Sequence, residues 1–142
     1  MQAPISQFVN VGNTKLHYLS TSQEVTSKIT LLLHGWPTSS YLWRNVMSYL
    51  ALDETVIALD LPGFGQSDKP TKGAYSLDYY QRIIQQFLDE LGVKEVNLVV
   101  HDLGGPVGLY WAVNNQDKLH KLVLLNTLIY PELHWFVKLF IT

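Results

Sequence analysis

The sequence predicts an α/β fold in which a doubly wound, largely parallel sheet carries helices on both faces. Short apolar runs recur along the chain, and segments in which apolar residues follow helical spacing separate them. Alternation of strands and helices favours right-handed crossovers and a parallel sheet. The length of 142 residues suggests one domain.

An N-terminal β-hairpin is expected before the parallel strands. Two partly alternating segments, 7–11 and 15–20, flank Gly12-Asn13, a pair that is common in tight turns. Four apolar runs follow, and we expect each to form a strand buried on both faces. These runs are residues 29–33, 55–59, 96–100 and 121–125.

Three helices are expected between the apolar runs. Residues 43–50 and 80–91 carry apolar side chains at i, i+3, i+4 and i+7, and Ser76 is a suitable N-cap for the second segment. Residues 103–114 are apolar nearly all round, which predicts a buried helix. The aromatic residues expected in the core are Trp43, Tyr110 and Trp111.

Composition and charge exclude several classes of protein. The net charge is −2, so there is no basic excess to neutralise the phosphates of a nucleic acid. The absence of cysteine excludes disulfides and thiolate sites. There is no secretory signal pattern, membrane-spanning run or metal-ligand cluster. We therefore expect a cytoplasmic protein without cofactor, metal, nucleic acid or membrane.

The segment Asp102-Leu103-Gly104-Gly105 follows one apolar run and opens the apolar helix. A side chain on such a sharp strand-to-helix turn is thrust outward at the carboxyl end of the sheet, as in a nucleophile elbow. Gly104 and Gly105 relieve crowding in that turn. The alternative is that Asp102 is an ordinary N-cap of the helix.

Two further polar segments are expected at the same edge of the sheet. His34-Gly35-Trp36-Pro37 follows the run 29–33, and the loop that begins at Asp60 follows the next run. Ligands of parallel α/β sheets bind beyond the carboxyl ends of the strands. The three segments together therefore predict a ligand site around Asp102.

The three motifs, in this order, resemble the α/β-hydrolase superfamily, and within it the haloalkane dehalogenase and epoxide hydrolase branch. The matching stretches are HGWPTSSYLWRNV at 34–46, DLPGFGQSDKP at 60–70 and VVHDLGG at 99–105. The resemblance extends from about Phe8 to Pro131. It implies a partial hydrolase sheet that lacks the cap and the C-terminal strands of the family.

The resemblance also implies an organisation for the chain. Residues 1–130 correspond to the N-terminal part of the hydrolase core, and residues 131–142 to the start of a cap-like apolar helix. Residues 133–141 are apolar on all sides of that helix and need a partner to bury them. The expected partner is the missing C-terminal half or another chain.

The resemblance implies that Asp102 is the catalytic nucleophile. A carboxylate is ionised at neutral pH, so it can attack an electrophilic carbon without a base and form a covalent ester. The backbone N–H groups of Trp36 and Leu103 would form the oxyanion hole. The expected substrate is a small apolar compound such as a haloalkane or an epoxide. The residues expected to support the site are His34, Gly35, Pro37, Gly104 and Asn126.

The histidine base and the acid that the family uses to hydrolyse the ester have no evident counterpart. His101 precedes the elbow and should point away, His120 lies at the amino end of a strand, and His134 lies on the terminal helix. His17 is expected to be exposed. Asn126 stands where some relatives place the acid, and it offers hydrogen bonds but no charge.

Two function classes follow from these observations. The first is a truncated hydrolase, inactive alone, and the alternative is a non-catalytic pseudo-hydrolase that serves as a binding or assembly module. Leu103 and Trp36 also depart from the tryptophan and asparagine that many dehalogenases use to hold the halide. The resemblance therefore leaves the dehalogenase and epoxide hydrolase reactions both open.

Overall fold

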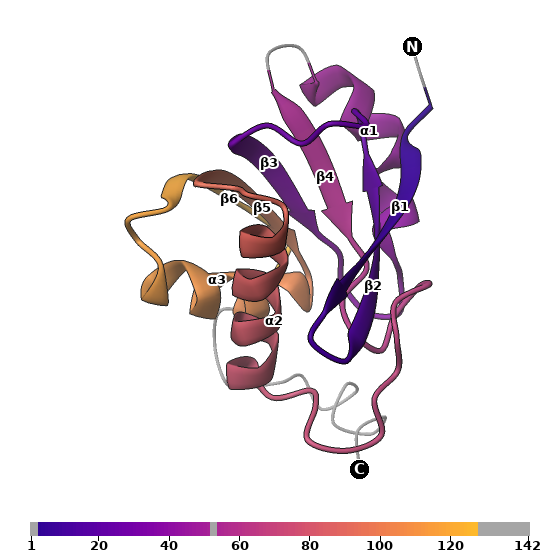
Figure 1. Cartoon of the computed structure of the whole chain (residues 1–142). Helices are drawn as coiled ribbons and strands as arrows, with labels where there is room; N and C mark the ends of the chain where they lie inside the picture. The colour runs from indigo at the N-terminus through magenta and orange to yellow at the C-terminus, as the bar shows by residue number, and fades with distance from the viewer. Residues whose placement is uncertain (1–2, 52–53, 128–142) are drawn as a thin grey trace.

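The predicted sheet is present in the computed structural model, which describes residues 3–51 and 54–127 (Figure 1). Six strands lie in the order β1-β2-β4-β3-β5-β6. In chain order the elements are β1 (Ile5–Val11), β2 (Thr14–Ser20), β3 (Lys28–Leu33), the 3₁₀ turn η1 (Ser40–Trp43), α1 (Arg44–Leu50), β4 (Thr55–Leu59), α2 (Leu77–Glu90), β5 (Glu95–His101), α3 (Gly104–Asn114) and β6 (Leu119–Leu125).

The predicted N-terminal hairpin is confirmed. β1 and β2 pair antiparallel along their whole length, from Ile5 opposite Ser20 to Val11 opposite Thr14. Gly12 sits in the turn at φ 55°, a conformation that glycine adopts without steric cost. β2 then pairs antiparallel with β4 and joins the hairpin to the rest of the sheet.

The other four strands are parallel, as the sequence predicts. β3 lies between β4 and β5, with Leu33 opposite both Leu59 and Val100. β5 pairs with β6, and His101 lies opposite Leu125. The carboxyl ends of these strands therefore meet at one edge of the sheet, where the residues of the predicted site follow them.

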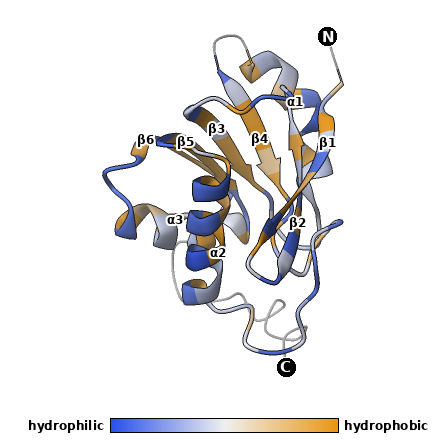
Figure 2. Ribbon diagram, in the orientation of Figure 1, coloured by the Kyte–Doolittle hydropathy of each residue, from blue (hydrophilic) through white to orange (hydrophobic). Residues whose placement is uncertain are grey.

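Helices cover both faces of the central strands. Leu31 and Leu33 pack in the core cluster that contains residues of α2 and α3, whereas Leu32 packs in a second cluster with Trp43 and Met47. Adjacent residues of β3 point to opposite faces, so each face receives an apolar layer. Figure 2 shows the central strands as largely hydrophobic, with hydrophilic residues along the outer side of α2.

Three predictions of burial are wrong. The run 121–125 forms β6, but Leu122, Val123, Leu124 and Leu125 are 38–44% exposed, because β6 is the outer strand of the described sheet and has one neighbour. α3 is not buried all round, since Tyr110 and Val113 are 37% and 66% exposed. α3 packs one side against α2 and β5 and turns the other outward. Of the aromatic residues expected in the core, Trp43 and Trp111 are buried, but Tyr110 is exposed on α3, so the prediction for Tyr110 is wrong.

The predicted cap-like segment 131–142, which includes His134 and the apolar residues 133–141, lies outside the described residues. Among the residues that the structure does describe, the helices are too short or too polar to span a bilayer.

Candidate active site

Asp102 occupies a strained turn between β5 and α3. Its φ of 50° lies in the left-handed region, which a residue other than glycine adopts at a cost of about 1–3 kcal/mol. The Asp102 carbonyl accepts hydrogen bonds from the Gly105 N–H at 2.9 Å and from the Thr127 hydroxyl at 2.7 Å. The elbow backbone is therefore held from two directions, by α3 and by the residues that follow β6.

The Asp102 carboxylate faces the turn after β3 and does not cap its own helix. The Trp36 backbone N–H donates to Asp102 Oδ1 at 2.8 Å. The N-cap position of α3 is Leu103, which makes no side-chain capping bond. The alternative of an ordinary helix cap at Asp102 is therefore wrong, and the side chain is directed toward the edge of the sheet.

Two glycines allow the backbones around Asp102 to approach each other closely. A Cβ added to Gly35 would overlap the Asp102 side chain. A Cβ added to Gly104 would lie 2.7 Å from the carbonyl oxygens of Leu33 and His34, well inside van der Waals contact. Both positions therefore require the absence of a side chain for the elbow to sit against the 33–36 segment.

His34 holds that segment in place from the interior. Its Nε2 accepts the Leu61 N–H at 3.1 Å, so the ring proton is on Nδ1, which donates to the Gly35 carbonyl at 2.8 Å. Burial lowers the pKa of His34, which keeps the imidazole neutral at pH 7. The peptide bond between Trp36 and Pro37 is cis.

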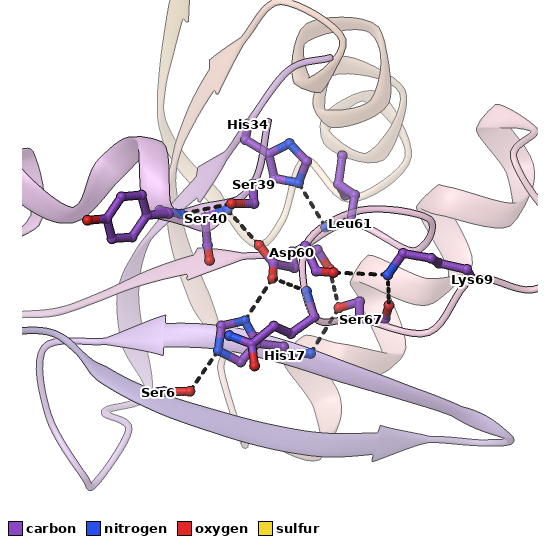
Figure 3. A network of polar contacts seen from close by, with 12 residues as sticks. Ser6, His17, His34, Ser39, Ser40, Asp60, Leu61, Ser67 and Lys69 are labelled. Carbon is purple, nitrogen blue, oxygen red and sulfur yellow. Dashed lines mark hydrogen bonds and ion pairs between the residues drawn. The ribbon is translucent and has the colours of Figure 1, made fainter. Parts of the chain in front are cut away.

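Asp60, at the end of β4, anchors the neighbouring loop (Figure 3). Its Oδ1 accepts the Ser40 N–H at 2.6 Å, and its Oδ2 accepts the Gln66 N–H at 2.8 Å and lies 2.8 Å from His17 Nδ1. Burial alone raises the pKa of Asp60, but these hydrogen bonds outweigh it and hold the pKa below its ordinary value of 3.8. Asp60 is therefore an ionised carboxylate in the interior.

The prediction that His17 is exposed is wrong, since it is 2% exposed. Adjacent residues of a strand point to opposite faces, so the His17 side chain points away from the face of β2 that carries the core residues Leu16 and Tyr18. The hairpin alone would leave the His17 face open to solvent. The loop after β4 folds over that face, with Ser67 Oγ accepting the His17 N–H at 2.9 Å. Because this loop is polar, its sequence has no apolar pattern from which the burial of His17 could be predicted.

None of the four histidines that the structure describes hydrogen bonds to Asp102. His17 and His34 are engaged as described above. His101 packs edge-on against Trp43, with ring centroids 6.4 Å apart, on the α1 side of the sheet. His120 lies 3.3 Å from Glu95, at the amino end of β5.

The remaining predicted site residues border the elbow. Leu103 is half-buried and directly precedes α3, while Trp36 is 58% exposed. Asn126 follows β6 at φ 39° and is exposed. The structure therefore brings Trp36, Gly35, Gly104 and Asp102 into contact range, with His34 behind them and Asn126 at the end of the next strand.

Comparisons with known proteins agree with this architecture. The family model described as the alpha/beta hydrolase fold matches residues 30–140. A soluble epoxide hydrolase of Corynebacterium sp. (strain C12) is 36% identical over 116 residues, which are 82% of this chain and 39% of that protein. A haloalkane dehalogenase of Agrobacterium fabrum is 38% identical over 99 residues, which are 70% of this chain and 32% of that protein.

Solved structures give the same result. The crystal structure of a haloalkane dehalogenase from Agrobacterium tumefaciens C58 superimposes on this chain with a TM-score of 0.78 and 32% sequence identity. The matched region covers 89% of this chain and 42% of the dehalogenase chain. The chain therefore spans about two fifths of the length of the proteins it matches.

Proposed function

The chain belongs to the α/β-hydrolase fold family, and we propose that it carries the nucleophile of a hydrolase that acts on a small apolar substrate such as a haloalkane or an epoxide. The observation that supports this proposal most strongly is the hydrogen bond from the Trp36 N–H to Asp102 Oδ1, on a strained elbow directly before α3. A carboxylate held in this way presents its second oxygen, Oδ2, for attack.

The proposed first step forms an ester. Asp102 Oδ2 attacks the electrophilic carbon of the substrate. With a haloalkane, the carbon–halogen bond breaks and the halide departs with the electron pair. With an epoxide, a ring carbon–oxygen bond breaks and the resulting alkoxide takes a proton from solvent. Asp102 Oδ1 becomes the carbonyl oxygen of the ester.

Hydrolysis of the ester would use the same hydrogen bond. Attack of water on the ester carbon moves negative charge onto Oδ1, which the Trp36 N–H already contacts at 2.8 Å. The Leu103 N–H, at the start of α3, is the second proposed donor. Removal of one such donor from an oxyanion hole typically lowers the rate by about 10²–10³-fold.

The water also needs a base, and the four described histidines are held elsewhere. We therefore expect the 142-residue chain to react once and then to stall as the ester. In the alternative of a non-catalytic binding or assembly module, Asp102 would not react at all.

Bromide release tests this proposal. We expect the chain, incubated with 1-bromobutane, to release one equivalent of bromide per chain, and the Asp102→Asn variant to release none. Asp117→Asn, which removes an exposed carboxylate from a loop, is the matched control and should behave like the unmodified chain. Equal release from the unmodified chain and Asp102→Asn would contradict the nucleophile, and release beyond one equivalent would contradict the stalled ester.

A further inference from the structure

Ser6, His17 and Asp60 form a hydrogen-bonded row (Figure 3). Asp102 takes part in neither of the two contacts that join these residues. Ser6 Oγ lies 2.8 Å from His17 Nε2, and His17 Nδ1 lies 2.8 Å from Asp60 Oδ2. We infer that Ser6 is a second nucleophile of this chain, which takes acyl groups from small aryl esters with His17 as its general base.

The hydrogen bonds around Asp60 fix the tautomer of His17. An ionised carboxylate only accepts hydrogen bonds, so the proton between Asp60 and His17 belongs to His17 Nδ1. In the neutral ring, His17 Nε2 then carries the lone pair and accepts a hydrogen bond from the Ser6 hydroxyl. This is the arrangement in which a histidine removes the proton of a serine while a carboxylate orients the ring.

Within this row the proposed base is buried and the proposed nucleophile is exposed, so a dissolved substrate can reach the nucleophile. His17 and Asp60 are 2% and 1% exposed, whereas Ser6 is exposed on the outer face of β1. The base is therefore fixed and shielded from water, and the hydroxyl can be reached from solvent. The Asp60 carboxylate also stabilises the imidazolium that forms when His17 takes the proton.

Phe8 supplies an apolar surface beside Ser6. Both residues lie on the outer face of β1, two positions apart, and Phe8 is 46% exposed. Its ring centroid lies 4.9 Å from that of His17, and Lys15 Nζ lies 4.4 Å above the ring. An aromatic leaving group can pack against the exposed part of the Phe8 side chain, which is why the inferred substrate class is a small aryl ester.

The inferred reaction is a transfer of an acyl group to Ser6. Ser6 Oγ attacks the carbonyl carbon of the ester, and the hydroxyl proton passes to His17 Nε2. The bond between that carbon and the aryl oxygen breaks, and the phenolate leaves with the electron pair and recovers the proton from His17. The product is an acyl-serine, which water hydrolyses slowly with His17 again as the base.

The test uses p-nitrophenyl acetate and the full chain with Asp102→Asn. This variant lacks the carboxylate of the proposed function, so the result at Ser6 does not depend on that proposal. Acetylation at each serine is followed by peptide mapping over time. Ser27 is the internal reference, because it is also exposed and the hydrogen bonds given for it go through its backbone. General-base assistance typically contributes about 10²–10⁴-fold, so we expect Ser6 to react at least about 100-fold faster than Ser27.

A matched pair of variants completes the test. Ser6→Ala should abolish acetylation at position 6, and Ser27→Ala should leave the rate at Ser6 unchanged. Both sites are exposed, so neither change removes a core contact. A rate at Ser6 less than tenfold above that at Ser27 would overturn the inference, because an exposed serine without a base would react equally fast.

Discussion

The backbone N–H of Trp36 and the carboxylate of Asp102 are joined by a hydrogen bond of 2.8 Å across 66 residues of sequence. The bond connects the turn after β3 with the elbow after β5, two strands that pair in parallel register up to Leu33 and Val100. The sheet therefore positions both residues, and the geometry of the site depends on how closely the two turns approach.

We predict that Gly35→Ala disrupts this approach. The added methyl group would overlap the Asp102 side chain and displace the carboxylate from the Trp36 N–H. Overpacking of this kind typically costs about 1–3 kcal/mol, and we expect a similar loss of unfolding free energy in denaturant titrations. The rate of bromide release from 1-bromobutane should fall by at least about tenfold, because a small misplacement of a reacting group is costly.

Gly73→Asn is the matched control for Gly35→Ala. Gly73 has a φ of 66° and nothing within 4 Å of an added Cβ, and asparagine tolerates this backbone conformation. We expect this variant to retain both stability and bromide release. An unchanged rate in Gly35→Ala would show that the position of Asp102 does not depend on the close approach of Gly35.

The stability of the chain should fall as the pH drops below the ordinary histidine pKa of 6.5, in part because of His34. Burial lowers the pKa of folded His34, so the unfolded chain binds more protons than the folded chain in this range. The contribution of His34 is complete above pH 6.5 and is lost as the pH falls toward the lowered value. One such group changes the unfolding free energy by at most about 1.4 kcal/mol per pH unit.

Denaturant titrations between pH 7 and pH 5 measure this effect. His34→Gln removes the titrating ring, so it should reduce the pH dependence of the unfolding free energy, whatever its effect on stability at pH 7. A slope that is the same in the variant and the unmodified chain would contradict a buried, neutral His34.

The exposed strand β6 should promote self-association of the chain. Its four apolar residues from Leu122 to Leu125 are 38–44% exposed. In the sheet formed by the described residues, β6 is an edge strand, and such a strand offers unpaired backbone groups to another strand. We expect the apparent mass in sedimentation experiments to rise with protein concentration. Val123→Lys should reduce that rise, because lysine on an edge strand opposes pairing.

Val113→Lys provides the control for charge. Val113 is 66% exposed on α3, so the substitution adds the same charge away from the edge strand. Association that responds equally to both substitutions would point to net charge, and not to pairing through β6.

The elements that the sequence predicted well are those whose signal is local. The helix α2 is an example, because Ser76 accepts the Tyr79 N–H at 3.1 Å as its N-cap and the apolar residues from Tyr80 to Leu88 face the core. The apolar runs likewise gave the four parallel strands. The strand-to-helix turn at Asp102 was predictable because an apolar run, an acid and two glycines occur in this order within a few residues.

The features that the sequence did not predict depend on distant segments. His17 is buried because Asp60 and Ser67, 43 and 50 residues later, fold over the outer face of the hairpin. The exposure of β6 depends on the absence of a second neighbouring strand among the described residues, which its own apolar sequence cannot reveal. The hydrogen bond from the Trp36 N–H likewise required the relative positions of β3 and β5.

The covalent chemistry of Asp102 is the central claim, and the location of the alkyl group after reaction with 1-bromobutane tests it most directly. The modified chain is divided, and one half is treated with hydroxylamine before peptide mapping. An ester on Asp102 predicts a butyl group at position 102 that hydroxylamine replaces with a hydroxamate. A butyl group that resists hydroxylamine and maps to a histidine or lysine, with Asp102 unmodified, would contradict the account.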